Sequence, residues 1–222
     1  MASARSLIEE IKRDLESVER EIRNHPYLAE LEAGRVRRED LKRFAGEQYH
    51  IIRSDLRSVA LLVNRFGVAA SGPFFQGVLG GETAALDALK AFARALGMNE
   101  APLEGYEPAP GALAYSAFMA WLALYGGDAE VAAGFLVNFQ AWGANCGRMS
   151  RALRSQYGLS ETDTAFFDLF AAPPSEFESG ALAVVEGGLT RGADPRLIKR
   201  SGRLLQGYEK LFWDTMHALS QR

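Results

Sequence analysis

The sequence contains few residues that could form covalent cross-links or bind transition metals. Its 222 residues include one cysteine, Cys146, and three histidines. A single cysteine excludes a disulfide within the chain and is typical of a reducing compartment. We therefore expect a cytoplasmic protein whose fold depends on packing rather than on cross-links.

Long apolar runs and a strong net charge are also missing. No stretch reaches the roughly 20 apolar residues of a membrane-spanning helix, and residues 1–10 are charged and amphipathic, unlike a signal peptide. The net charge of -3 creates no field that would attract nucleic acid or an anionic membrane. We therefore expect neither a membrane partner nor a nucleic-acid partner.

Helical periodicity is the main positive signal. Apolar residues recur at three- and four-residue spacing, and no window alternates with a period of two for long enough to predict a sheet. Because the length suits one large core, the pattern predicts a single all-α domain over residues 1–222. The expected helices run from about Leu7 to before Pro26, from Arg38 to Phe66, from Glu82 to Leu96, from Ala112 to Tyr125 and from Ala129 to Tyr157.

Turn-forming residues set the expected ends of these helices. Gly67 to Pro73 and the proline-containing segment from Glu100 to Gly111 are predicted to be loops, and Gly97 occupies a position that favours a helix C-terminus. The helices after Gly111 are apolar on more than one face, which is typical of buried helices. Two further helix starts are predicted from capping residues: Ser175 with Glu178 as a capping box, and Asp194 with Pro195.

Two acid-x-x-His motifs raise the question of a metal site: Glu47 with His50, and Asp214 with His217. Paired Glu-x-x-His motifs bind metals in di-iron helical bundles, where Glu82 and Glu209 could supply further carboxylates. The same spacing also arises on solvated helix faces, and His217 lies near the C-terminus, where helices fray. We favour the second interpretation and expect neither a metal nor another cofactor.

Gly143 and Gly147 lie four residues apart, so they would let another group approach one face of a helix. That group could be heme, with His25 as its ligand, or a neighbouring helix, and we favour helix packing. Cys146 lacks a nearby base that would make its thiol a nucleophile. We expect it to be a small, buried apolar residue.

Glu209 and Phe212 are three residues apart, which places them on one side of the last helix. Such a side either packs into the core or lines a pocket in which an acid lies beside an aromatic wall. The chain resembles the TenA / thiaminase II family over nearly its whole length, and the resemblance implies a heme-oxygenase-like bundle of about seven or eight helices. The segments that carry it are Asn24 to Leu28, Phe44 to Ile52, Ala114 to Tyr125 and Tyr208 to Asp214.

The resemblance implies a site in which aromatic walls enclose an aminopyrimidine and acids hold its nitrogens. Glu209 matches the catalytic glutamate of the family, Phe212 matches the aromatic residue after it, and Tyr115 matches the tyrosine of the fourth-helix motif. The implied activity is hydrolysis or deamination of a pyrimidine in thiamin salvage. Glu209 would be the general acid and base.

Other positions depart from the family pattern. Gln48 replaces an aspartate, Ile51 replaces a tyrosine, the alignment places Gln140 at the position of the cysteine nucleophile, and Phe170 replaces a further tyrosine. Glutamine carries no charge and cannot act as a nucleophile. We therefore expect a divergent site with weak or absent thiaminase activity.

The expected site combines residues from four helices and takes a small-molecule substrate. A homodimer or homotetramer is expected, because TenA-like proteins resemble tetramers and PqqC-like proteins resemble dimers. Two alternatives remain: a PqqC-like or metal-dependent oxidase that uses Glu47, His50, Glu82 and Glu209, and a member that binds a ligand without catalysis. The expected catalytic residues are Glu209 and Glu47, and the expected substrate contacts are Tyr115, Phe212, Gln48, Gln140, Phe170 and Tyr49.

Overall fold

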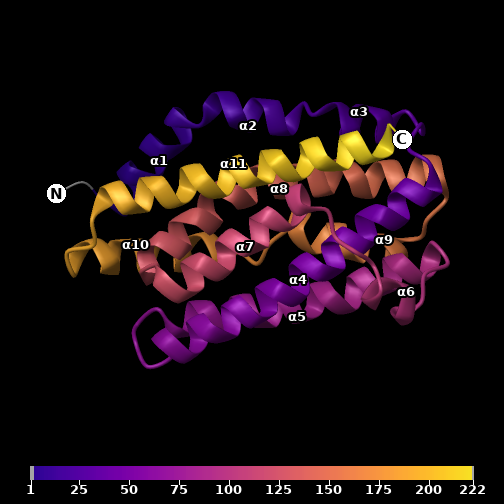
Figure 1. Ribbon diagram of the computed structural model, residues 1–222. Helices are drawn as coiled ribbons and strands as arrows, with labels where there is room; N and C mark the ends of the chain where they lie inside the picture. Colours follow the sequence, from indigo (N-terminus) through magenta and orange to yellow (C-terminus); the bar gives the residue numbers. More distant parts are fainter. Residues whose placement is uncertain (1–2, 222) are drawn as a thin grey trace.

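The periodic segments form eleven α-helices in the computed structural model, which describes residues 3–221 (Figure 1). No strand occurs in this range, so the predicted all-α fold is confirmed. The helices are α1 (Ala4–Asp14), α2 (Glu16–Arg23), α3 (Pro26–Glu32), α4 (Arg38–Phe66), α5 (Gly72–Ala95), α6 (Glu100–Glu104), α7 (Pro110–Tyr125), α8 (Asp128–Tyr157), α9 (Glu161–Ala171), α10 (Glu176–Thr190) and α11 (Pro195–Ser220).

Several predicted helix ends are confirmed by their local chemistry. Helix α4 covers the predicted range Arg38 to Phe66. After α5, Gly97 adopts a φ of 82°, a left-handed conformation that glycine tolerates without steric cost. At the start of α11, the Asp194 side chain accepts a hydrogen bond from the Arg196 N–H, and Pro195 occupies the first turn.

The N-terminal segment differs from the single helix expected before Pro26. It divides at Leu15 into α1 and α2, and Pro26 then begins α3 rather than ending a helix. Proline is well suited to the first helical position because its missing N–H would have no partner there. His25 is the N-cap of α3, where its Nδ1 accepts from the Tyr27 N–H at 3.3 Å.

The middle of the chain is more helical than expected. Helix α5 begins at Gly72, ten residues before the predicted start, because Pro73 fits a first helical turn. The predicted loop from Glu100 to Gly111 contains α6 and the first residues of α7. Helix α9 was not predicted, and α10 begins near the expected place without a side-chain hydrogen bond from Ser175.

The long helices surround a central space. Helix α8 has the most extensive buried surface, α11 packs along it, and α1 to α3 lie against both α8 and α11 (Figure 1). Helices α4 and α5 form an antiparallel pair, and α7 packs against both α4 and α11. Helices α4, α7, α8 and α11 thus enclose one interior region, with α5, α9 and α10 at its end.

Helix α7 is less buried than its sequence predicts. One of its sides packs inward through residues such as Met119 and Leu122, but its C-terminal end exposes three large apolar side chains. Trp121 is 43%, Leu124 is 52% and Tyr125 is 68% exposed. Part of the apolar surface of α7 is therefore exposed to solvent in the single chain.

The two glycines of α8 make different contacts. A Cβ atom at Gly143 would lie 2.7 Å from the Phe170 carbonyl oxygen of α9, whereas one at Gly147 would lie 3.5 Å from the Ala171 Cβ atom. Of these two glycines, only Gly143 lies where α8 and α9 approach too closely for a larger residue. This approach places Phe170 against the interior region described below.

We predict opposite stability changes for alanine at the two glycines. Gly143→Ala should lower the free energy of unfolding by about 1–3 kcal/mol, because α9 must move away from α8. Gly147→Ala should leave it unchanged or raise it by up to about 1 kcal/mol, because alanine favours a helix over glycine. Urea denaturation would measure both, and equal stabilities of the two variants would contradict the described contact.

Candidate active site

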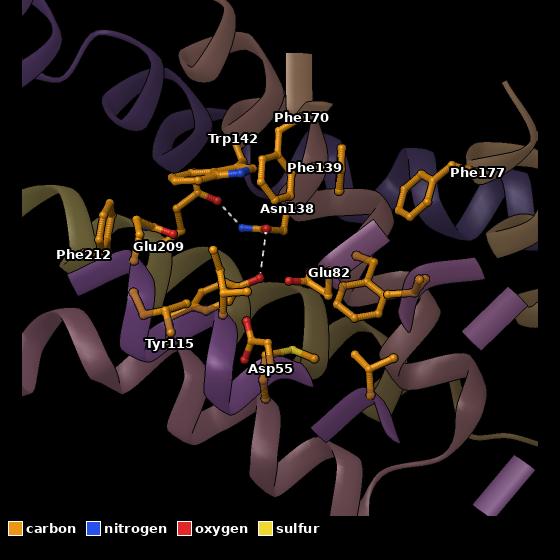
Figure 2. Close-up of a pocket in the computed structure, with 17 residues that line it drawn as sticks. Asp55, Glu82, Tyr115, Asn138, Phe139, Trp142, Phe170, Phe177, Glu209 and Phe212 are labelled. Carbon is orange, nitrogen blue, oxygen red and sulfur yellow. Dashed lines mark hydrogen bonds between the residues drawn. The ribbon is translucent and has the colours of Figure 1, made fainter. Parts of the chain in front are cut away.

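The enclosing helices leave a cavity of ≈ 70 Å³ in the middle of the bundle (Figure 2). Its walls are mostly aromatic and aliphatic, and its polar groups are concentrated in a few side chains. Ligand sites in proteins commonly combine such apolar walls with a few convergent polar groups. We name this space the inner cavity.

Helical spacing determines which side chains reach the inner cavity. On α4, the lining residues Gln48, Ile52, Asp55 and Val59 recur at three- and four-residue intervals along one face. On α8, Asn138 and Trp142 are four residues apart and both line the cavity. The cavity is therefore formed by one stripe from each helix.

A chain of hydrogen bonds crosses the inner cavity (Figure 2). The Tyr115 hydroxyl donates to Asn138 Oδ1 at 3.2 Å, and Asn138 Nδ2 donates to Glu209 Oε2. The second carboxyl oxygen of Glu209 accepts from Trp213 Nε1 at 3.2 Å. Helices α7, α8 and α11 are thus connected through the Glu209 carboxyl group.

Burial changes the acidity of Glu209. The side chain is 2% exposed, and its removal from water raises the pKa of the carboxyl group to about 8, although the donors Trp213 and Asn138 oppose this shift. The group is therefore mainly protonated at neutral pH. It can donate a proton to a ligand and then accept one back, as a general acid and base must.

Two further acids line the cavity: Asp55, which was not expected there, and Glu82, which was expected only in the metal-dependent alternative. Asp55 of α4 is 8% exposed, and its Oδ1 atom has no hydrogen-bond partner. Burial raises the pKa of Asp55 above its ordinary value, with a further contribution from Glu82 of α5, and burial raises the pKa of Glu82 to about 7. Burial and the three nearby carboxyl groups also raise the pKa of Tyr115, which stays a neutral hydroxyl.

Aromatic residues separate the inner cavity from a larger cleft of ≈ 650 Å³ between α5 and α10. Phe139, Phe170 and Phe177 line both spaces, and the ring centroids of Phe139 and Phe177 are 4.6 Å apart. Val78 and Glu82 complete the shared wall. The inner cavity and the cleft are therefore adjacent and share one wall.

Five of the eight expected site residues line the inner cavity: Glu209, Tyr115, Phe212, Gln48 and Phe170. They come from four different helices, α4, α7, α9 and α11, which the fold brings together from distant parts of the sequence. The expected pairing of Glu209 with Phe212 on one helix side agrees with their shared position in the cavity wall. Glu47, Tyr49 and Gln140 lie elsewhere.

Glu47 is fully buried but points away from the cavity. One of its oxygens accepts from the Tyr106 hydroxyl and from the Ala109 N–H, both at 2.9 Å. One residue turns a helix by about 100°, so Glu47 cannot share the direction of Gln48. Its contacts anchor the segment before α7, which corrects its predicted place at the pocket.

Tyr49 and Gln140 are displaced for the same geometrical reason. The Tyr49 hydroxyl accepts from Arg53 Nη1 at 3.1 Å, and its ring packs edge-on against His50. Gln140 is exposed, and its carbonyl oxygen accepts from Arg23 on α2. Asn138, two residues earlier, faces Glu209 instead. Its four-residue spacing from Trp142 places both residues on one face of α8, and this spacing could have identified Asn138 from the sequence.

The histidines that could have marked a metal site make structural contacts. His25 Nε2 lies 3.1 Å from Asp214 Oδ1, and His50 Nε2 lies 3.2 Å from the Leu103 carbonyl oxygen. Across residues 3–221, no three His, Cys, Asp or Glu side chains converge as a metal-binding group. Cys146 is buried in the core, and burial raises the pKa of its thiol.

Comparisons with known proteins agree on a family and a fold. A model of the TENA/THI-4/PQQC family matches residues 12–168. A TenA homologue from Pyrococcus furiosus is 18% identical, with a TM-score of 0.74, over 95% of this chain and 99% of that chain. A TenA family transcription regulator from Silicibacter sp. TM1040 is 16% identical, with a TM-score of 0.75, over 95% and 96% of the two chains.

A domain of unknown function from Shewanella denitrificans, described as having a heme oxygenase-like fold, is 14% identical, with a TM-score of 0.75, over 100% of this chain and 94% of that chain. The predicted heme-oxygenase-like fold is therefore confirmed. No protein with a curated description matches the sequence. Within the described residues, none of the helices combines the length and the apolar character that crossing a membrane requires.

The raised pKa of Glu209 predicts a specific pH dependence of stability. The folded state binds the Glu209 proton more tightly than the unfolded state, whose pKa is near 4.5. The stabilisation is therefore complete below pH 4.5 and is lost as the pH rises towards 8, at up to about 1.4 kcal/mol per pH unit. Glutamine does not titrate, so the free energy of unfolding of the Glu209→Gln variant should fall less between pH 5 and pH 8 than that of the wild type.

Urea denaturation of both proteins at several pH values would measure this difference. Asp55 and Glu82 are present in both proteins, so their contributions cancel in the comparison. Parallel pH profiles of the wild type and Glu209→Gln would show that the carboxyl group is not perturbed by burial.

Proposed function

The chain belongs to the TENA/THI-4/PQQC family, and on that premise we propose that it binds a small nitrogen-containing heteroaromatic ring and hydrolyses it. The observation that carries this proposal is the buried Glu209 carboxyl group, which faces an aromatic cavity and has a pKa of about 8. A ring with an exocyclic amine offers the donors and acceptors that such a carboxyl group can bind. An aminopyrimidine of thiamin salvage is the substrate class that the family suggests.

The ring would lie between Phe212 and Tyr115, with Glu209 at its nitrogens. Protonated Glu209 donates to a ring nitrogen and makes the adjacent carbon electrophilic. The resulting carboxylate takes a proton from water as the oxygen attacks that carbon, and then passes this proton to the leaving amine. The hydroxyl proton of the adduct returns to Glu209 as the carbonyl group forms, which restores the protonated acid. The products are the oxo-substituted ring and ammonia, with no change in oxidation state.

Asn138 and Gln48 define how this site would differ from the usual family chemistry. Asn138 faces Glu209 and cannot act as a nucleophile, so water attacks the ring directly. Gln48 offers a neutral amide where a carboxylate would favour a protonated ring. We therefore expect slow or absent hydrolysis of thiamin itself, and a cytoplasmic location is part of the same proposal.

A non-catalytic member of the family is the second candidate. The specific observation that favours it is Asn138, because an amide facing the general acid leaves water as the sole nucleophile. The two candidates share the ligand site and differ in turnover. The oxidase hypothesis has no such support, because Glu47 and His50 point away from the cavity that Glu82 and Glu209 line.

Binding and turnover of 4-aminopyrimidines test the proposal. We expect binding that calorimetry detects, and release of ammonia that a coupled assay detects. Glu209→Gln should weaken binding by about 10-fold, because an amide N–H is a weaker donor to the ring nitrogen than the acid O–H. Glu39→Gln, at an exposed position of α4, is the matched control and should change neither quantity.

Binding without release of ammonia would select the non-catalytic candidate. Equal affinities of the wild type and Glu209→Gln would contradict the assignment of the ring to this carboxyl group. Rapid hydrolysis of thiamin, near the 10 per second of an average enzyme, would contradict the interpretation of Gln48 and Asn138.

We also propose that the exposed apolar end of α7, formed by Trp121, Leu124 and Tyr125, is covered in a homodimer or homotetramer. A stable interface of this kind buries more than about 1,000 Å². Light scattering should give a multiple of the 24.3 kDa chain mass, and Leu124→Glu should shift the protein towards one chain. A wild-type mass of one chain at micromolar concentration would overturn this assignment.

A further inference from the structure

Asp55 and Glu82 form a second polar region of the inner cavity, separate from the Tyr115–Asn138–Glu209 chain. Figure 2 shows both carboxyl groups directed towards the open space below Asn138. Asp55 comes from α4 and Glu82 from α5, so the pair depends on the packing of these two helices. Neither residue is used by the hydrolysis proposed above.

This acid pair lacks a positive partner among residues 3–221. The inner cavity is lined by no lysine, arginine or histidine within the described range of the chain. Asp55 is more than nine-tenths buried, and its Oδ1 atom accepts no hydrogen bond. An unpaired buried carboxyl group is costly to retain, because the folded state offers it neither water nor a donor.

We propose that Asp55 and Glu82 bind a cationic nitrogen group of the ligand, such as a primary ammonium or an amidinium. The proposal rests on the proposed function, because the cation is a substituent of the ring that Glu209 holds. The cation would supply the N–H donors that Asp55 Oδ1 lacks. It would also supply the positive charge that is missing from the cavity wall.

The surroundings of the pair favour an organic cation. Tyr115, Met119 and Val59 line the same space, and such walls suit the hydrocarbon part of an alkylammonium group better than the oxygen-rich shell of Ca²⁺ or Mg²⁺. An aromatic face such as that of Tyr115 also attracts an ammonium group. The ligand class is therefore an aminoalkyl-substituted or amidine-substituted heteroaromatic.

The pKa values agree with this assignment. Burial raises the pKa of both carboxyl groups, and Glu82 reaches about 7. Such shifts mean that the pair is at least partly protonated at neutral pH, because burial disfavours the charged form, and at Asp55 the charge of Glu82 adds to this effect. A bound cation would favour the ionised form, so the pair and the cation would neutralise each other within the cavity.

Two probes separate the cation from the ring. One is a 4-aminopyrimidine with a 5-(3-aminopropyl) chain, and the other carries a 5-(3-hydroxypropyl) chain of the same length. Calorimetry would measure the affinity of each for the wild type, Asp55→Asn, Glu82→Gln and Asp87→Asn. Asp87 is an exposed acid on α5, five residues after Glu82, and serves as the matched control.

We expect the wild type to bind the aminopropyl probe at least about 10-fold more tightly than the hydroxypropyl probe, as a charge-assisted hydrogen bond predicts. This preference should fall to about threefold or less in Asp55→Asn and in Glu82→Gln, and should persist in Asp87→Asn. Both changes nearly keep the side-chain volume, and each removes an acid whose pKa burial raises, so the fold should be retained. Circular dichroism would verify this for each variant.

Equal affinities of the two probes for the wild type would overturn the proposal, and so would a preference that persists in both cavity variants. If the hydroxypropyl probe binds and Glu209→Gln abolishes its binding, the proposed function stands while the cation subsite fails. If neither probe binds the wild type, both fail. If one of the two cavity variants does not fold, the other still tests the proposal, because each variant removes one acid of the pair.

Discussion

The cost of holding carboxyl groups away from water is the constraint on which the centre of this protein depends. Glu209 is retained in the core because Trp213 and Asn138 satisfy its two oxygens. Trp213 lies on the same helix as Glu209, but the Asn138 donor requires α8 and α11 to keep one orientation relative to each other, and Tyr115 extends this requirement to α7. The polar chain thus specifies how three helices pack, and desolvation gives its acid a pKa suited to proton transfer.

Much of the fold could be predicted from the sequence, because helical periodicity and local caps are short-range signals. The range of α4, the left-handed Gly97 and the Asp194 cap are examples. Helix α5 was predicted too short because Pro73 and its neighbouring glycines resemble a loop, although packing against α4 maintains the helix there. Single-sequence patterns do not contain that tertiary contribution.

The site residues were predicted correctly only where the alignment with the family assigned each position to the correct side of its helix. Tyr115, Glu209 and Phe212 reach the inner cavity, but Glu47 and Gln140 are one and two residues from the positions that do. On a helix such offsets reverse or rotate a side chain by about 100–200°. Asp55 was missed, and Glu82 was considered only as a metal ligand, for a different reason. They are 27 residues apart in the numbering and meet only through the pairing of α4 with α5.

The central claim is that burial holds the Glu209 carboxyl group protonated near neutral pH, where it can exchange a proton with a bound ring. The most direct test is a ¹³C NMR titration of glutamate side-chain carboxyl carbons, with Glu209→Gln used to assign the signal. A midpoint near the pKa of about 8 is the predicted result. A midpoint near 4.5, the ordinary value for a solvated glutamate, would contradict the account.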